Sequence, residues 1–308
     1  MTPVVFALPG NEAMADALAA RLAAERGACT VRRFPDDESY VRVETAVSGR
    51  DAILVCTLAR PDGRIAQLLL LASAARESGA TRVGLVAPYL AYMRQDARFS
   101  PGECVSAKVF ARWIGLHFDW LITVDPHLHR FANLAELYPI PARAAHAAPA
   151  IAAWLRENVP APVLVGPDME SAQWVEEVAR LAGAPSIVLA KRRRGDREVE
   201  VSIPESAMLA GRTPVLVDDI VSTARTMIAA VRHLRAAGLA PPVCVAVHGI
   251  FAGDALHALQ AAGAGRVASC DTVPHSTNVI ALDEALCSCV ADLLGNGPPP
   301  DLDGKAAA

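Results

Sequence analysis

Two adjacent carboxylates, Asp218 and Asp219, directly follow a short apolar run from Val215 to Val217. Small and hydroxyl side chains come next, and then a helical apolar pattern that ends near Gly238. This order predicts a buried strand, an acidic turn, a hydroxyl-rich loop and a helix. Free N–H groups and the dipole at the start of that helix favour an anion, whereas the acids can bind hydroxyls or share a metal ion. The stretch therefore suits a sugar phosphate, and its alternative is a buried strand that ends in a solvated acidic turn.

Two further candidates follow predicted strands. His127 comes after the apolar run from Trp120 to Val124 and can ligate a metal ion or bond a phosphate. Asp168 follows the run from Val163 to Gly166 and can contact magnesium directly or through water. Open α/β sheets place ligands at the carboxyl ends of their strands, so both positions are suitable. The alternative for His127 is a structural, hydrogen-bonded role.

Four consecutive cations, Lys191 to Arg194, follow another apolar strand pattern. They either form a solvated basic turn or clamp transferring phosphates, because arginine chelates phosphate oxygens and lysine supplies a point charge. Arg94 lies in a polar stretch, residues 88–103, that we predict to be a long flexible loop able to close over a nucleotide. The chain has no GxxxxGKS or GxxxxGKT sequence, which argues against a P-loop kinase.

Composition limits the class of protein. At 308 residues, with 53% apolar side chains, the chain has room for two globular domains. Its net charge of −4 gives no reason to expect nucleic acid or an anionic membrane as a partner. The seven cysteines form no zinc or redox pattern, and the N-terminal residues lack a signal-peptide pattern. We therefore expect a reduced, cytoplasmic setting.

Strand and helix patterns alternate along the chain, which predicts an α/β fold with mostly parallel sheets flanked by helices. The alternation stops in residues 88–103 and again between Pro139 and Pro149, where proline and alanine predict a crossover between domains. We expect an N-terminal domain over residues 1–143, a C-terminal domain over 144–295 and a disordered tail over 296–308.

Six motifs, in one order, resemble those of the ribose-phosphate diphosphokinases, also called phosphoribosyl-diphosphate synthetases. They are Phe34-Pro35-Asp36-Asp37-Glu38 for FPDGE, Tyr92-Met93-Arg94-Gln95-Asp96 for YxRQD, Val124-Asp125-Pro126-His127 for VDxH, Gly166-Pro167-Asp168 for SPD, Lys191-Arg192-Arg193 for KxR and Val217 to Thr226 for VDDxxxTGGT. The last also resembles the phosphoribosyl-diphosphate motif of type I phosphoribosyltransferases. The likeness covers about residues 4 to 290, which is nearly the whole chain.

The resemblance implies two tandem phosphoribosyltransferase-like α/β domains that self-associate as dimers or hexamers. It implies transfer of the diphosphate group of ATP to the C1 hydroxyl of ribose 5-phosphate, which gives AMP and phosphoribosyl diphosphate for nucleotide biosynthesis, with Mg²⁺ as cofactor. The implied ribose 5-phosphate site is Asp218, Asp219, Ser222, Thr223, Ala224, Arg225 and Thr226. The implied ATP site is Phe34, Asp36, Glu38, Arg94, Gln95 and His127. The implied catalytic residues are Lys191 and Arg193, and the implied metal ligands are His127, Asp168, Asp218 and Asp219.

The chain departs from this pattern at glycine positions. Ala224 and Arg225 replace two glycines of the VDDxxxTGGT motif, and Asp37 replaces the glycine of FPDGE. Glycine at such positions permits positive φ or close approach of a ligand. Ala46 and Ser48 stand where phosphate-activated members of the family carry serine and arginine, which predicts weak or absent activation by phosphate.

Two other functions were weighed against catalysis of this reaction. A non-catalytic homologue that regulates true synthetase subunits would be expected to lose its cationic or metal-side residues. This chain keeps Arg94, His127, Asp168, Lys191 and Arg193. A phosphoribosyltransferase acting on a nucleobase would have no use for the FPD and RQD elements or for a second α/β half.

Overall fold

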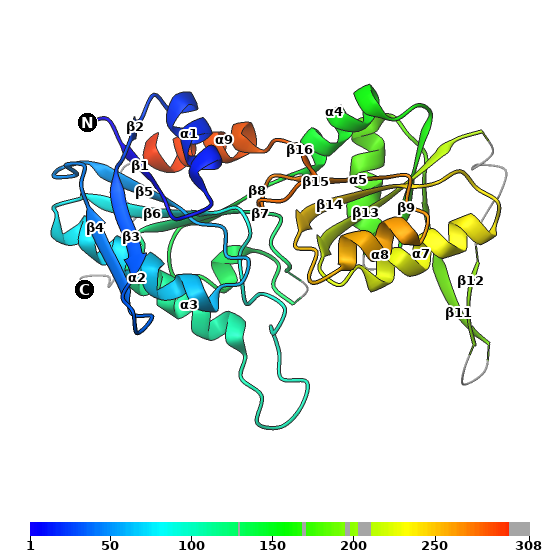
Figure 1. Ribbon diagram of the computed structural model, residues 1–308, viewed down its shortest axis with the longest axis horizontal. Coiled ribbons are helices and arrows are strands. Elements are labelled where there is room, and N and C mark those ends of the chain that lie inside the picture. The colour runs from blue at the N-terminus through cyan, green and yellow to red at the C-terminus, as the bar shows by residue number, and fades with distance from the viewer. Residues whose placement is uncertain (129, 168–170, 195–197, 203–210, 296–308) are drawn as a thin grey trace, which may run out of the picture. The chain divides into compact units, whose positions relative to one another are not determined.

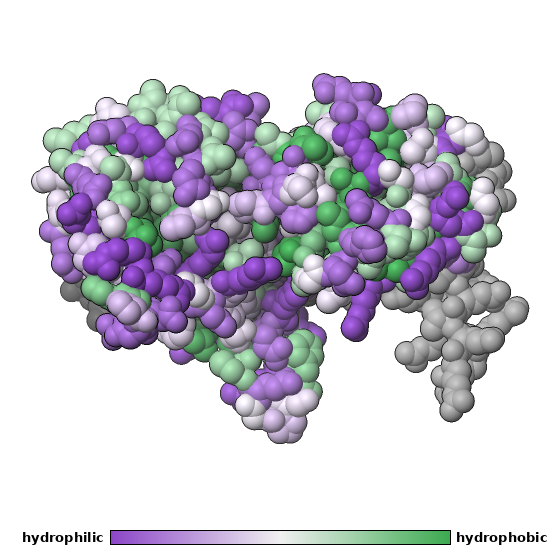
Figure 2. All heavy atoms as spheres, viewed as in Figure 1, coloured by the Kyte–Doolittle hydropathy of each residue, from purple (hydrophilic) through white to green (hydrophobic). Residues whose placement is uncertain are grey.

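A computed structural model describes residues 1–128, 130–167, 171–194, 198–202 and 211–295. The chain divides into two compact units, the first formed by Met1–Ala145 with Asp283–Gly295, and the second by His146–Leu282 (Figure 1). On the face shown in Figure 2, polar side chains spread over both units and apolar ones form smaller patches. Within the described residues, no helix has the length and apolar character needed to cross a membrane.

The first unit is built on a six-stranded sheet in which all neighbouring strands are parallel. In spatial order its strands are β2 (Glu25–Arg26), β1 (Val4–Ala7), β5 (Asp51–Val55), β6 (Arg82–Ala87), β7 (Trp120–Val124) and β8 (Ala142–Ala145). The central strands are almost entirely buried, because helices cover both faces of the sheet.

The helices of the first unit are α1 (Glu12–Arg21), α2 (Asp62–Glu77), α3 (Ser106–His117) and α9 (Asp283–Gly295), with a 3₁₀ turn at Leu134–Glu136. Figure 1 shows α1 and α9 on one side of the sheet and α2 and α3 on the other. An antiparallel hairpin of β3 (Cys29–Arg33) and β4 (Ser39–Val43) packs against α2.

Helix α9 packs on α1, β7 and β8 of the first unit, although it follows the second unit in the sequence. The sequence-based ranges placed it in the C-terminal domain. Arg21 pairs with Asp283 at the start of α9 at 2.5 Å. Arg82 donates a 3.2 Å hydrogen bond to the carbonyl of Leu293 near its end. These contacts come from residues more than two hundred positions away, so local patterns could not reveal them.

The second unit contains another six-stranded sheet with parallel neighbours. Its strands, in spatial order, are β10 (Ser186–Val188), β9 (Pro162–Gly166), β13 (Thr213–Val221), β14 (Val243–Gly249), β15 (Arg266–Cys270) and β16 (Asn278–Ile280). Its helices are α4 (Ala148–Asn158), α5 (Ala172–Ala182), α7 (Arg225–Ala236) and α8 (Ala255–Ala261). Helix α4 packs beside α5 and α7 beside α8.

The predicted fold class is confirmed, because each unit is a parallel sheet flanked by helices. The predicted crossover stretch, Pro139–Pro149, contains the boundary between the two units, after Ala145. It also contains β8, which joins the sheet edge by pairing with β7. One local prediction differs from the structure. Residues Lys191 to Arg194 belong to β11 (Ala190–Arg194), which pairs antiparallel with β12 (Glu198–Ser202) instead of forming a turn.

Candidate functional site

The acidic pair lies inside a strand, not after it. Strand β13 continues to Val221 because it stays paired with β14, with Asp218 opposite Ala246 and Ile220 opposite His248. Both carboxylates are half-buried. The N–H of Asp219 donates to Asp218 Oδ1 at 3.1 Å, and the N–H of Ile220 donates to Asp219 Oδ1 at 2.7 Å. These bonds hold both carboxylates close to the backbone near the carboxyl end of β13.

The turn from β13 into α7 is fixed by its backbone. Ala224 precedes the first residue of α7 and adopts the left-handed conformation, with φ 57° and ψ 11°. Its methyl group is buried in an apolar cluster with Val221 and Met227. The carbonyl of Ser222 accepts a 3.0 Å hydrogen bond from the N–H of Ala252. The turn thus keeps a conformation suited to glycine, at a cost of about 1 kcal/mol for the alanine.

Exposed polar groups gather at the beginning of α7. Thr223, Arg225 and Thr226 are exposed, and the first turn of the helix has no acidic residue. A cation at a helix N-terminus is unfavourable with respect to the dipole, whereas an anion is favoured there. A phosphate at this turn would pair with the unbonded N–H groups, the two hydroxyls and Arg225 together.

A buried polar group that sequence reasoning missed lies at the end of neighbouring β14. His248 is only 1% exposed, and its Nδ1 lies 2.9 Å from Thr272 Oγ1. The Thr272 hydroxyl donates to the carbonyl of Val247 at 2.7 Å, so its oxygen accepts a hydrogen bond from the Nδ1–H group of His248. Because His248 pairs in register with Ile220, this group lies on the strand beside the acidic pair. A histidine that ends an apolar run was the available sequence signal.

In the first unit, the predicted loop over residues 88–103 is packed in its first half. Tyr89, Leu90, Ala91 and Met93 are buried. The phenol of Tyr92 donates to Asp62 Oδ1, and its ring contacts the Phe110 ring with centroids 4.9 Å apart. Burial, together with the neighbouring Asp62 carboxylate, raises the pKa of Tyr92 to about 12. Arg94, directly after this packed part, is exposed.

The second half of the loop is organised by two carboxylates. Glu103 Oε2 accepts hydrogen bonds from the backbone N–H groups of Phe99 and Ser100, at 2.8 and 3.0 Å, and from Gln95 Nε2 at 3.0 Å. These bonds hold the pKa of Glu103 below its usual value, the backbone bonds having the largest effect. Asp96 is buried and pairs with Arg130 Nε at 3.3 Å.

Arg130 therefore connects the segment that carries Arg94 and Gln95 to the segment that carries His127. His127 is half-buried shortly after β7, and Asp125 between them has a positive φ of 29°. The local sequence around Arg130 carries no signal for this role, because nothing in it indicates a partner 34 positions earlier.

The FPDGE-like motif forms the turn of the β3–β4 hairpin. The N–H of Phe34 donates to the carbonyl of Glu38 at 2.8 Å, and the N–H of Asp37 donates to the carbonyl of Phe34 at 3.0 Å. Asp37 is left-handed with φ 69°, a region that aspartate tolerates better than most residues. Phe34, Asp36 and Glu38 are all exposed, so an aromatic ring and two carboxylates are available to a ligand.

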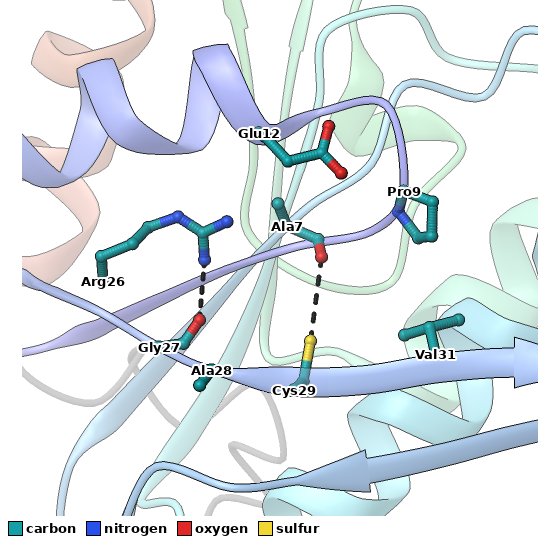
Figure 3. A pocket seen from close by; sticks show the side chains of 8 residues that line it. All are labelled: Ala7, Pro9, Glu12, Arg26, Gly27, Ala28, Cys29 and Val31. Atoms are coloured by element: carbon teal, nitrogen blue, oxygen red, sulfur yellow. Dashed lines mark hydrogen bonds between the residues drawn. The ribbon is translucent and has the colours of Figure 1, made fainter.

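The first unit also has a pocket of about 280 Å³, which is separate from the predicted site residues (Figure 3). It is lined by Ala7, Pro9, Glu12, Arg26, Gly27, Ala28, Cys29 and Val31. The Arg26 guanidinium donates to the carbonyls of Val5 and Gly27 and pairs with Asp16. Burial raises the pKa of the Cys29 thiol, which contacts the Ala7 carbonyl. None of the predicted site residues lines this pocket.

The donor set of the second unit fits a magnesium ion. Mg²⁺ prefers oxygen ligands and is commonly held by one or two carboxylates together with substrate phosphates. Asp218 and Asp219 supply half-buried carboxylates next to the turn that suits a phosphate. Among the residues that the structure describes, no three or more histidine, cysteine or acidic side chains could hold a metal ion by themselves.

Three predicted residues cannot be placed as side chains. Asp168 lies outside the described residues. Lys191 and Arg193 are placed by their backbone in β11, opposite Val201 and Val199 of β12. The other predicted residues fall into two groups, those from Phe34 to His127 in the first unit and those from Asp218 to Thr226 in the second.

Comparison with known proteins connects the two units to one family. Residues 3–116 match the N-terminal domain of ribose phosphate pyrophosphokinase, and residues 133–285 match the phosphoribosyl transferase domain. Ribose-phosphate pyrophosphokinase from Methanopyrus kandleri is 34% identical over 295 residues, which are 95% of this chain and 100% of that protein. The chain belongs to the ribose-phosphate pyrophosphokinase family. The resemblance drawn from the six motifs is confirmed.

Other members of the ribose-phosphate pyrophosphokinase family agree with this assignment. The protein of that name from Halobacterium salinarum is 34% identical over 281 residues, 91% of this chain and 98% of that protein. A crystal structure of phosphoribosylpyrophosphate synthetase from Mycobacterium smegmatis has the same fold, with a TM-score of 0.83. It covers 96% of this chain and 100% of that one at 24% identity.

Two departures from the ribose-phosphate pyrophosphokinase motifs share one structural property. Ala224 and Asp37 replace motif glycines, and both have positive φ, 57° and 69°. The backbone conformation that glycine permits is therefore kept at both turns, although the side chains differ.

Proposed function

We propose that this chain transfers the diphosphate group of ATP to ribose 5-phosphate. The oxygen of the C1 hydroxyl attacks the β-phosphorus of ATP, and the bond between the α- and β-phosphates breaks. AMP leaves, the hydroxyl proton is lost to solvent, and phosphoribosyl diphosphate is the product for nucleotide biosynthesis. The relatives from Methanopyrus kandleri and Halobacterium salinarum, both named ribose-phosphate pyrophosphokinase, support this reaction.

The observation that carries the proposal is the turn between β13 and α7. Asp218 and Asp219 lie near the carboxyl end of β13, and the turn that follows, with left-handed Ala224, leads into the N-terminus of α7. In this proposal the acids bind the ribose hydroxyls and the hydroxyl and N–H groups from Ser222 to Thr226 bind the 5-phosphate. Arg225 adds a cation for the same phosphate.

The first unit is proposed to bind ATP. Phe34, Asp36 and Glu38, in the exposed hairpin turn, recognise the adenine base. They do so for ATP that is bound in the active site of a neighbouring subunit. Arg94, Gln95 and His127 bind the nucleotide from the two segments that Arg130 connects.

Lys191 and Arg193 are the proposed catalytic residues, because cations lower the energy of the charge that develops on the transferred diphosphate.

Mg²⁺ is the proposed cofactor, with Asp218 and Asp219 as ligands on the ribose 5-phosphate side and His127 and Asp168 as ligands on the ATP side. When bound, it neutralises phosphate charge and orients the diphosphate for in-line attack. We further propose a cytoplasmic enzyme that associates as a dimer or hexamer and acts on ATP and ribose 5-phosphate without nucleic acid or membrane as partner.

The test is to incubate the pure protein with Mg²⁺, ATP and ribose 5-phosphate and to measure AMP and phosphoribosyl diphosphate. Equal amounts of both products are expected, and chelation of Mg²⁺ should stop their formation. Lys191→Ala should lower kcat by about 10²-fold or more, because a cation at the transferring group is lost. Lys108→Ala is the matched control, since Lys108 is exposed on α3, and it should retain full activity.

Absence of AMP at all Mg²⁺ and substrate concentrations would reject the catalytic proposal. It would favour the second candidate, a non-catalytic homologue that binds synthetase subunits and regulates them. AMP without phosphoribosyl diphosphate would instead indicate a hydrolase.

A further inference from the structure

The outer face of the β3–β4 hairpin carries a stack of three side chains. The guanidinium carbon of Arg32 lies 4.6 Å from the centroid of the Phe34 ring and 4.1 Å from that of the Tyr40 ring. The two rings meet edge to face, with centroids 5.9 Å apart and planes at 86°. Arg32 and Tyr40 are direct cross-strand partners. One guanidinium thus contacts both aromatic rings at the end of the hairpin.

The opposite face of the hairpin fixes this stack to the first unit. Cys29, Val41 and Val43 pack against the apolar core. Arg33 Nη2 donates a 3.0 Å hydrogen bond to the carbonyl of Gly63 in the first turn of α2. Because side chains alternate along a strand, anchoring the inner face holds the outer face with Arg32 toward solvent.

The Phe34 ring is the part of the stack that a ligand can reach, since Phe34 is 40% exposed. Every nucleobase presents a π-face that stacks on an aromatic ring. The neighbouring carboxylates of Asp36 and Glu38 can accept hydrogen bonds from amino groups of a base. An exposed ring beside two acceptors therefore suits an amino-bearing heteroaromatic ring.

We propose that Arg32 is a positioning residue for the donor nucleotide, because its guanidinium holds the Phe34 ring in the orientation that stacks the purine base of ATP. This inference rests on the proposed function. A planar guanidinium stacks on aromatic faces and stays charged at all working pH values. It covers one face of the Phe34 ring, limits the rotation of that ring and leaves the other face to the base.

The expected signature is a change in nucleotide binding without a change in chemistry. The base does not take part in bond making or breaking, so contacts to it stabilise the ground state and the transition state equally. Loss of such contacts raises KM and leaves kcat unchanged.

The experiment compares Arg32→Ala and Arg32→Lys with the wild-type protein and with Arg42→Ala. Arg42 lies on the outer face of the same hairpin, pairs with Glu44, and is 62% exposed. We expect Arg32→Ala to raise the KM and the calorimetric Kd for ATP about 3- to 5-fold, the size of one lost exposed cation–π contact, the contact with Phe34. Arg32→Lys keeps the charge but not the planar stack, so its KM and Kd for ATP should lie between those of the wild type and Arg32→Ala. Arg42→Ala should match the wild type, and the KM for ribose 5-phosphate should stay constant throughout.

A purine offers more stacking surface than a pyrimidine, so the preference for ATP over UTP in kcat/KM should shrink in Arg32→Ala. The inference is overturned if Arg32→Ala binds ATP as the wild type does, or no worse than Arg42→Ala. It is also overturned if kcat and Tm fall while the ATP/UTP ratio is unchanged, because Arg32 would then only stabilise the hairpin.

The calorimetric measurement separates this inference from the proposed reaction. A wild-type protein that makes AMP, with Arg32→Ala unaffected, keeps the reaction and rejects the role of Arg32. A protein that makes no AMP but loses ATP affinity in Arg32→Ala keeps the role of Arg32 and rejects the reaction. A wild-type protein that neither binds ATP nor makes AMP rejects both.

Discussion

Arg130 pairs with the buried carboxylate of Asp96 through its Nε atom at 3.3 Å. This ion pair joins two segments of the first unit that carry proposed ATP-binding residues. The Arg130 guanidinium also lies over the Phe99 ring, 5.6 Å from its centroid. It therefore contacts both a buried residue of the loop, Asp96, and an exposed one, Phe99.

We expect Arg130→Ala to raise the KM for ATP several-fold, because the pair positions the loop that carries Arg94 and Gln95. We also expect it to lower the stability of the first unit by about 1 kcal/mol. The cost is moderate because the Asp96 carboxylate is buried but the Arg130 side chain is largely solvated. Arg130→Lys should recover part of the affinity. Steady-state kinetics and urea unfolding followed by Trp120 fluorescence measure the two effects. Arg112→Ala, an exposed change on α3, is the control. An unchanged KM would show that the pair does not position the loop.

The left-handed conformation of Ala224 predicts that glycine is tolerated there. Ala224→Gly removes the strain of positive φ, but it also removes a buried methyl group and increases the freedom of the unfolded chain. These effects oppose one another, so the stability of the second unit should stay nearly constant. Ala229→Gly, an exposed change inside α7, should cost about 1 kcal/mol. Urea unfolding followed by Trp154 fluorescence compares them. Equal losses in the two variants would contradict the left-handed turn.

Arg82 makes two hydrogen bonds to Asp51, at 3.0 and 2.7 Å, and also binds the carbonyl of Leu293 in α9. Arg82→Ala should therefore lower the stability of the first unit by about 2 kcal/mol, since a partly buried carboxylate and carbonyl lose their donor. Proteolysis within residues 283–295 should become faster. Arg76→Ala breaks the more exposed pair with Asp119 and should cost less than about 1 kcal/mol. Equal effects of the two changes would argue against this role of Arg82.

The phenol of Tyr92 keeps its proton to higher pH in the folded protein, because burial and the Asp62 carboxylate raise its pKa from 10.0 to about 12. The unfolded chain releases this proton near pH 10, so stability from this group is full below that pH and is lost as pH rises toward 12. Urea unfolding between pH 9 and pH 12 should show the loss, and Tyr92→Phe should make the dependence shallower. If the stability of Tyr92→Phe falls with pH as steeply as that of the wild type, Tyr92 is not the source of the dependence.

Weak or absent activation by phosphate remains a prediction from Ala46 and Ser48. The nearest arginine, Arg50, donates to the carbonyls of Ala46 and Thr2 and pairs with Glu25, so its guanidinium is already engaged. Initial rates measured with and without inorganic phosphate, at constant ionic strength set by chloride, should differ by less than about 2-fold. A steep dependence on phosphate would contradict this prediction.

Much of the fold could be read from local patterns. The apolar runs over residues 3–8, 82–87 and 120–124 predict strands, and the structure has the strands β1, β6 and β7 there. They are buried because helices cover both faces of the parallel sheet. The local patterns failed where strand pairing, and not amino-acid composition, determined the secondary structure. Alanine-rich β8 and cationic β11 look like loops, yet each is held as a strand by backbone hydrogen bonds to a neighbour. Such bonds do not depend on side-chain type.

The family and the candidate residues follow directly from the amino-acid sequence, since six short motifs in a fixed order are specific in a way that no single one is. Three features became visible only in the folded chain. Ala224 and Asp37 keep left-handed turns, α9 belongs with the first unit, and Arg32 contacts Phe34 while Arg130 contacts Asp96. Motifs depend on residue identity, which the chain carries directly. Backbone conformation and pairing between distant residues arise when packing and hydrogen bonding select one arrangement among the many that local preference allows.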